Sequence, residues 1–186
     1  KIMKKLKRKN LEYILRKQKK DLTKSCIDGF RKAKYKYILV MDGDLQHRPS
    51  DIKKFLYVFK KRDPAIVVGT RNLFYGENHN LSFFRLMASR FLVIIVNSLL
   101  GSKTTDPMSG FFMFNKKIFF ENEHRLFKKG YKILLDLLYV CKNNEKILDV
   151  KINFDTRKKG KSKMSFKILF YLIIMIFFKF YVRIFK

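Results

Sequence analysis

The stretch YILVMDGDLQH, residues 37–47, carries an apolar run into two aspartates, in a chain with 43 Lys and Arg against 15 Asp and Glu. Such runs are typical of strands buried on both faces, as in parallel sheets covered by helices. Ligands bind at the carboxyl ends of strands in open α/β sheets, which would place Asp42 and Asp44 at a binding edge. An acidic pair suits a divalent cation that also binds phosphate oxygens. These residues alone leave a metal–diphosphate site and an ordinary acidic turn both open.

Strands and helices alternate on both sides of this stretch. Runs of apolar residues predict buried strands, apolar residues at helical spacing predict amphipathic helices, and Ser50 is a predicted N-cap. The pattern predicts an α/β domain with a mainly parallel sheet flanked by helices. The predicted strands are 11–15, 35–41, 65–70 and 146–154; the predicted helices are 21–34, 50–59, 82–101 and 130–144, and 104–112 is a predicted turn-rich loop.

The formal net charge of +28 points to a polyanionic partner, which could be nucleic acid, an anionic membrane face or a phosphorylated substrate. A drift in composition that leaves most lysines simply solvated explains the total charge equally well. Hydrophobic residues make up 47% of the chain, enough for a sizeable core. Cys26 and Cys141 lack the spacing of a metal site, and reduced thiols in a cytoplasmic setting are the expectation.

Five motifs follow one another in a fixed order along the chain. They are MDGDLQH (41–47), VVGTR (67–71), FFRLMASR (83–90), DPMSGFFMF (106–114) and RKKGKSKMS (157–165). Their order and spacing resemble family-2 glycosyltransferases of the polyprenyl-phosphate type, which include the dolichyl-phosphate mannosyltransferases. The resemblance implies a GT-A type, Rossmann-like fold.

The same resemblance implies how the chain is divided. Residues 1–164 would form the catalytic domain, and residues 165–186 a membrane-associated hydrophobic helix. The family's opening strands have no counterpart before residue 11, so we expect a catalytic domain that is incomplete at its N-terminus and inactive by itself.

Site residues are implied position by position. Asp42, Asp44 and Gln46 match metal-binding positions, with Mg²⁺ or Mn²⁺ as the cofactor. Asp44 and Arg71 match catalytic positions. The implied substrate-binding residues are Arg71, Arg85, Ser89, Asp106, Ser109, Arg157 and Lys163.

The implied reaction is inverting transfer of a sugar from a nucleotide-diphosphate sugar to a polyprenyl phosphate, either undecaprenyl or dolichyl, at the cytoplasmic face of the membrane. The acceptor phosphate is ionised near neutral pH, since its second pKa is about 6. A strong general base is therefore not required, and the protein's task is alignment and charge stabilisation.

The last part of the chain predicts contact with an anionic membrane surface. Residues 168–178, ILFYLIIMIFF, form an uninterrupted apolar run between basic residues. A spanning helix needs roughly 20 apolar residues, so an interfacial helix under a cationic face is favoured over a transmembrane one.

Two other functions remain open. A glycosyltransferase of the same fold that acts on a polysaccharide or a lipid hydroxyl would need a general base, which Asp136 or Asp106 would have to supply. A basic nucleic-acid-binding module would interleave basic and aromatic residues on one face. Here the basic residues cluster in termini and loops instead, so we expect no nucleic-acid partner.

Overall fold

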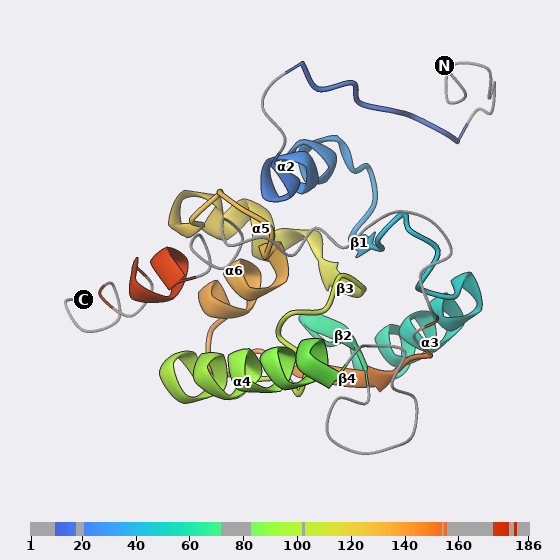
Figure 1. Cartoon of the computed structure of the whole chain (residues 1–186). Helices are drawn as coiled ribbons and strands as arrows, with labels where there is room; N and C mark the ends of the chain where they lie inside the picture. Colours follow the sequence, from blue (N-terminus) through green and yellow to red (C-terminus); the bar gives the residue numbers. More distant parts are fainter. Residues whose placement is uncertain are drawn as a thin grey trace.

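The computed structural model contains one mixed sheet of four strands between layers of helices (Figure 1). It describes residues 10–17, 21–71, 83–101, 103–153, 155, 173–178 and 181. The basic motif at 157–165 lies outside the described residues, as does most of the predicted C-terminal helix.

The strands occur in the spatial order β1-β3-β2-β4. β3 pairs antiparallel with both neighbours, and β2 pairs parallel with β4, so three strands point one way and β3 points the other. Ile38 lies opposite Phe114, and Val67 lies opposite Met113. The strand bounds are Tyr37–Val40 for β1, Ile66–Thr70 for β2, Phe112–Asn115 for β3 and Ile147–Lys151 for β4.

Helices cover both faces of the sheet, and alternate side chains of each strand point to opposite layers. On one face, α2 (Leu22–Lys32), α5 (Lys116–Asn122) and α6 (Ile133–Val140) pack over Val68 and Phe114 in the largest core cluster. On the other face, α3 packs Phe55 and Phe59 against Val67, Met113 and Val150. Figure 1 shows α3 and the α5–α6 pair on opposite sides of the sheet. α3 spans Ile52–Arg62 and follows a 3-10 turn, η1, at Pro49–Asp51; a second such turn, η2, spans Glu123–Arg125.

The long helix α4 (Phe83–Leu100) belongs to a separate apolar cluster. Its Val93 and Val96 pack with Leu135 of α6 and with Met175 and Ile176 of the helical segment 173–178. Gly101, at a φ of 86°, follows the helix in the left-handed conformation that the sequence pattern predicts for its end. Among the described residues, no helix combines the length and the apolar character that crossing a membrane requires.

The prediction of a strand at 11–15 is wrong. Residues 11–17 form no regular structure, and Leu15 is exposed, because none of the four strands of the described sheet pairs with them. The strand β3 is not among the predicted strands, and the predicted loop 104–112 includes only its first residue, Phe112. Its four residues follow a turn-rich motif and become a strand by pairing with β1 and β2. Ser50 is not a helix cap, because it lies inside η1.

Candidate active site

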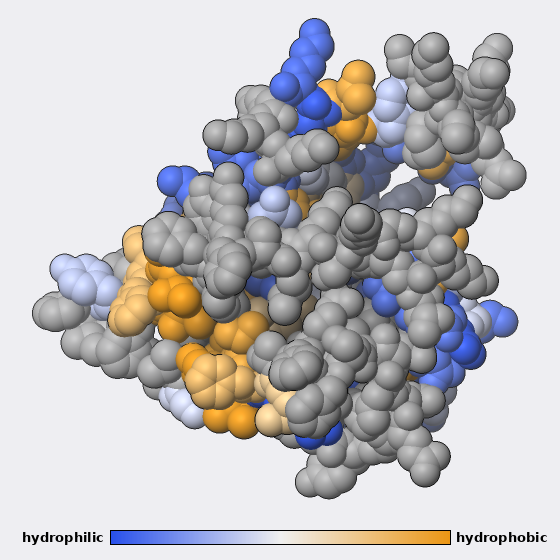
Figure 2. Space-filling view, in the orientation of Figure 1, coloured by the Kyte–Doolittle hydropathy of each residue, from blue (hydrophilic) through white to orange (hydrophobic). Residues whose placement is uncertain are grey.

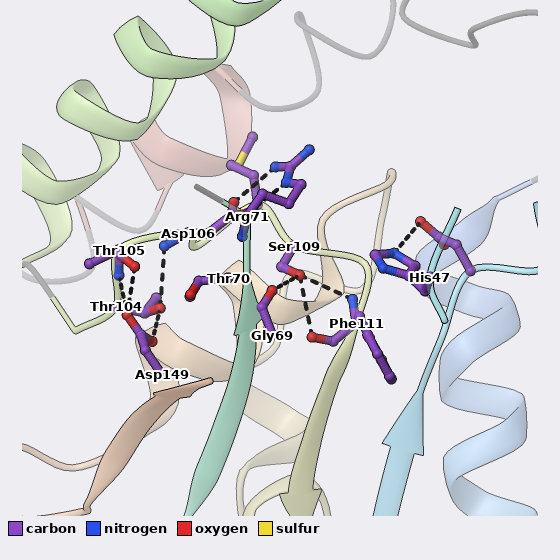
Figure 3. A network of polar contacts seen from close by, with 12 residues as sticks. His47, Gly69, Thr70, Arg71, Thr104, Thr105, Asp106, Ser109, Phe111 and Asp149 are labelled. Carbon is purple, nitrogen blue, oxygen red and sulfur yellow. Dashed lines mark hydrogen bonds and ion pairs between the residues drawn. The ribbon is translucent and has the colours of Figure 1, made fainter. Parts of the chain in front are cut away.

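Four segments that are distant in sequence meet at one edge of the sheet. β1, β2 and β4 end at this edge, and the antiparallel β3 begins there. The residues after β1, the residue after β2, the turn before β3 and the residues after β4 are therefore neighbours. Figure 3 shows side chains from the residues after β1 and β2 and from the turn before β3. The position agrees with the general placement of ligand sites in α/β sheets.

A bidentate ion pair between Arg71 and Asp106 lies at the centre of this edge. Arg71 Nε donates to Asp106 Oδ2 at 2.7 Å, and Arg71 Nη2 donates to Asp106 Oδ1 at 2.9 Å (Figure 3). Asp106 is 0% exposed, and the Arg71 side chain is 17% exposed. Burial would lower the pKa of Arg71, but the Asp106 carboxylate outweighs it and raises that pKa. The guanidinium therefore stays charged, and the two hydrogen bonds to Asp106 fix its direction.

The turn that carries Asp106 is tied to the strands on both sides. Asp149 of β4 accepts hydrogen bonds from Thr104 Oγ1 at 2.5 Å and from the backbone N–H of Thr105 at 2.9 Å. At the other end of the turn, the Ser109 hydroxyl donates to Gly69 O of β2 at 2.6 Å (Figure 3). Ser109 is buried, so this structure gives it an anchoring contact, and its predicted contact with substrate stays a prediction.

Asp42 packs directly against the backbone of Gly110. A Cβ atom at position 110 would lie 2.1 Å from Asp42 Oδ2, so only glycine leaves room for this carboxylate. The Asp42 side chain is still 46% exposed, and its Oδ2 lies 4.0 Å from Nε2 of the buried His47. Burial lowers the pKa of His47, which keeps the imidazole neutral near pH 7. Asp42 thus presents an accessible carboxylate beside a neutral ring.

Hydrogen bonds to Asp155 hold the loop after β1 against the residues after β4. Gln46 Nε2 donates to Asp155 O at 3.1 Å, and Asp155 N donates to Gln46 O at 2.9 Å. Arg48 adds two contacts to the Asp155 carboxylate, at 2.8 and 2.6 Å. Within the loop, Gln46 N donates to Asp44 Oδ1 at 3.2 Å, and Leu45 has a φ of 63°. Any metal contact of Gln46 would have to use its amide oxygen, because the nitrogen binds Asp155.

The acidic residues fit a cation that is shared with a ligand. Within the described ranges, no group of three or more His, Cys, Asp and Glu side chains has the arrangement of a metal site. Asp42 and Asp44 are the carboxylates that this edge offers after β1. Mg²⁺ commonly binds one or two protein carboxylates and completes its shell with phosphate oxygens and water. The donor set therefore fits a metal that arrives with a diphosphate.

Lys132 belongs to the site although its sequence gave no such indication. It falls within the predicted helix 130–144, and no motif of the sequence singles it out. In the structure its Nζ donates to Met108 O in the turn before β3, at 3.3 Å. Burial, followed by the charge of Arg71, lowers the pKa of Lys132 to about 8. The charges of Asp106 and Asp42 also act on it, in the opposite direction.

The remaining predicted residues are not brought to this site by the described part of the structure. Arg85 and Ser89 lie in α4, but their side chains are outside the described part. Arg157 and Lys163 lie outside the described residues altogether, so their predicted phosphate contacts remain predictions.

The fold resembles that of a solved glycosyltransferase complex. Glucosyl-3-phosphoglycerate synthase from Mycobacterium tuberculosis, in complex with Mn²⁺, uridine-diphosphate-glucose and glycerol 3-phosphate, aligns with a TM-score of 0.56 and 11% identity. The alignment covers 89% of this chain and 55% of that one. The likeness confirms the predicted GT-A type α/β fold.

Sequence comparison finds similar curated proteins, and the three described next are each called dolichol-phosphate mannosyltransferase. The one from Mycosarcoma maydis is 31% identical over 87% of this chain and 54% of its own length. The one from Pyrococcus furiosus is 32% identical over 86% of this chain and 45% of its own length. The one from Saccharomyces cerevisiae is 31% identical over 86% of this chain and 61% of its own length. The chain thus spans about half the length of the curated relatives it matches. The model of the family described as glycosyl transferase family 2 matches residues 1–121, and the chain belongs to that family.

Proposed function

We propose that the protein carrying this chain is an inverting glycosyltransferase that moves a sugar from a nucleotide-diphosphate sugar to a polyprenyl phosphate. The observation that carries the proposal is the sheet edge itself, where the accessible Asp42 carboxylate lies beside the fixed Arg71–Asp106 pair. Both substrates of such a reaction carry phosphate, which calls for acidic groups that hold a cation and for basic groups that bind oxygen.

In this proposal Asp42 and Asp44 hold a divalent cation, Mg²⁺ or Mn²⁺, which when bound takes up negative charge on the leaving diphosphate. Asp106 keeps Arg71 oriented, so that the guanidinium does not have to reorganise when charge develops. Gln46 and Arg48 fix the loop that carries both aspartates to Asp155. The chain's own residues therefore supply alignment and charge.

The names of similar proteins support the choice of substrates. The three curated relatives are called dolichol-phosphate mannosyltransferases, which supports a polyprenyl-phosphate acceptor. The solved complex of the same fold contains Mn²⁺ and a nucleotide sugar, which supports a metal-assisted nucleotide-sugar donor.

The hydrogen bonds that the buried carboxylates already accept within the protein favour a phosphate acceptor over a hydroxyl acceptor. A hydroxyl acceptor needs a general base. Asp106 accepts two hydrogen bonds from Arg71, and Asp136 accepts the backbone N–H groups of Phe127 and Lys128 at 3.0 and 3.1 Å. Both candidate bases are therefore held by donors of the protein itself.

Replacing Asp42 or Asp44 with asparagine tests the metal assignment. Either change removes a charged ligand of the cation. We expect the factor by which Mn²⁺ increases the affinity of the chain for GDP or UDP to fall at least about tenfold, or about 1.4 kcal/mol. Isothermal calorimetry with and without Mn²⁺ measures it. Asp63→Asn is the matched control, because Asp63 is exposed and precedes β2 at the opposite edge of the sheet. Equal affinity with and without the cation in the wild-type chain would contradict the assignment.

The membrane partner in this proposal is an anionic lipid surface at the cytoplasmic face. Apolar side chains gather over α4 and the 173–178 segment, as Figure 2 shows. Burial of the exposed apolar area and attraction between the cationic chain and anionic lipid both favour membrane binding. The exposed apolar residues are Met87, Phe91, Ile94, Ile173, Ile174, Phe177, Phe178 and Tyr181.

Serine in place of both Phe91 and Phe177 should weaken lipid binding. The two side chains are 64% and 68% exposed, so the folded protein loses little by the change. Each phenylalanine that is fully buried in lipid contributes about 1.5 kcal/mol or more, so the partition constant should fall roughly tenfold per side chain. Flotation with vesicles rich in phosphatidylserine measures the bound fraction. Tyr57→Ser on α3, 60% exposed, is the control, and a double variant that floats like the wild-type chain would place the contact on another surface.

A further inference from the structure

Lys132 is a partly buried cation at this edge of the sheet that the proposed reaction has not yet used. It immediately precedes α6, and its Nζ reaches Met108 O in the turn before β3, at 3.3 Å. An ammonium group has three donor hydrogens. A single hydrogen bond of this length to a neutral carbonyl does not compensate for the hydration that the ammonium group loses where it is shielded from water.

The charged groups around Lys132 do not neutralise it. Arg71 from the end of β2 repels it, while Asp106 from the turn and Asp42 from the end of β1 attract it. The Asp106 carboxylate is engaged by Arg71 in a bidentate pair, and Asp136, on α6 itself, accepts two backbone N–H groups. None of the ion pairs between described residues includes Lys132. A positive charge is therefore held at the edge of the sheet without a carboxylate in contact.

We propose that the Lys132 ammonium binds a phosphate oxygen of a substrate at this edge. The inference rests on the proposed function and adds a substrate-binding residue to it. A phosphate oxygen supplies the anionic acceptor that the ammonium lacks, and Met108 O directs the ammonium from the turn that also carries Asp106. The phosphate could belong to the donor's diphosphate or to the acceptor lipid.

A purely structural role for Lys132 makes a different prediction from phosphate binding. If Lys132 only donates a hydrogen bond to Met108 O, its protonated fraction is the same with and without ligand. A lysine that binds phosphate is more fully protonated in the complex, because a nearby anion favours the charged form. With a pKa of about 8 in the free chain, about half of the Lys132 side chains are neutral at pH 8.0. Binding of phosphate should then take up about half a proton.

Calorimetry at pH 8.0 in two buffers of different ionisation enthalpy measures this uptake. One arm uses GDP or UDP with Mn²⁺, and the other uses farnesyl phosphate, whose second pKa of about 6 leaves it fully ionised. Lys132→Met should lose the uptake and bind the relevant ligand roughly tenfold to hundredfold more weakly. Lys132→Arg, which is always charged, should restore most of the affinity without restoring the uptake.

Lys129→Met is the matched control, since Lys129 is an exposed lysine in the same loop, and it should behave as the wild-type chain does. Uptake with the nucleotide assigns Lys132 to the donor, and uptake with farnesyl phosphate assigns it to the acceptor. Binding of both ligands with no proton uptake by the wild-type chain, or unchanged uptake in Lys132→Met, overturns the inference and leaves the proposed function standing. Binding of neither ligand contradicts the proposed function, and this inference with it.

Discussion

Asparagine in place of Asp106 is expected to lower the free energy of unfolding by about 3 kcal/mol. Asp106 is fully buried and accepts two hydrogen bonds from Arg71, whose own side chain is mostly buried. Removing one partner of a buried ion pair leaves the other charge without compensation, which costs about 3–5 kcal/mol. The asparagine oxygen still accepts one hydrogen bond, so the lower end of that range applies. Urea denaturation followed by circular dichroism measures the change.

The same variant should also bind GDP or UDP very weakly, because Arg71 is no longer held in place. Glu12→Gln is the control, since it breaks an ion pair with Lys34 that is exposed on both sides. Exposed pairs contribute little, so its unfolding curve should match that of the wild-type chain. A wild-type unfolding curve for Asp106→Asn would mean that the Arg71–Asp106 pair does not form as described.

Alanine in place of Gly110 is expected to weaken cation-dependent diphosphate binding about hundredfold while leaving the fold intact. The new Cβ would lie 2.1 Å from Asp42 Oδ2 and 2.7 Å from Asp42 Cγ. The conflict is with a side chain that is 46% exposed, so the carboxylate can rotate away toward solvent at little cost to stability. A displacement of this size moves a cation ligand by about 1 Å, enough for an effect of that magnitude.

Calorimetry with Mn²⁺ and GDP or UDP measures the loss, and thermal unfolding checks the fold. Gly29→Ala is the control, because a Cβ there meets nothing within 4 Å. It lies inside α2, so it should raise the unfolding free energy by about 0.5–1 kcal/mol and leave binding unchanged. Full retention of Mn²⁺-dependent binding by Gly110→Ala would remove Asp42 from the set of cation ligands.

The parts of the fold that depend on local pattern were predictable from the sequence. β1 and β2 are runs of apolar residues, and α2 and α3 have apolar stripes with helical spacing, so neighbouring residues alone indicate their type. The edge location of Asp42 and Asp44 followed from the strand before them. The assignment of Arg71 and Asp106 came from motif resemblance, and their bidentate contact required the structure.

The unpredicted parts depend on partners far away in sequence. Four residues after a turn motif become β3 only because two strands flank them in space. Asp149, Asp155 and Lys132 have no local signal, since each acts on a distant segment. The Arg48–Asp155 contact joins residues 107 apart, and the Lys132–Met108 contact joins residues 24 apart. A strand at 11–15 was predicted from apolar content, which cannot reveal that it pairs with no strand in the described part of the chain.

The central position of β3 affects how the chain must fold as it is synthesised. β1 and β2 leave the ribosome before β3, yet each pairs with β3 and not with the other. Residues 41–111 separate β1 from β3, so the two strands cannot form an early hairpin. The edges of β1 and β2 that pair with β3 therefore stay unpaired until β3 has been synthesised. Pairing across long chain separations is slow and leaves apolar segments open to aggregation. The insertion of residues 112–115 therefore joins β1 to β2 and, in the same step, brings Asp106 to Arg71, before β4 adds to β2.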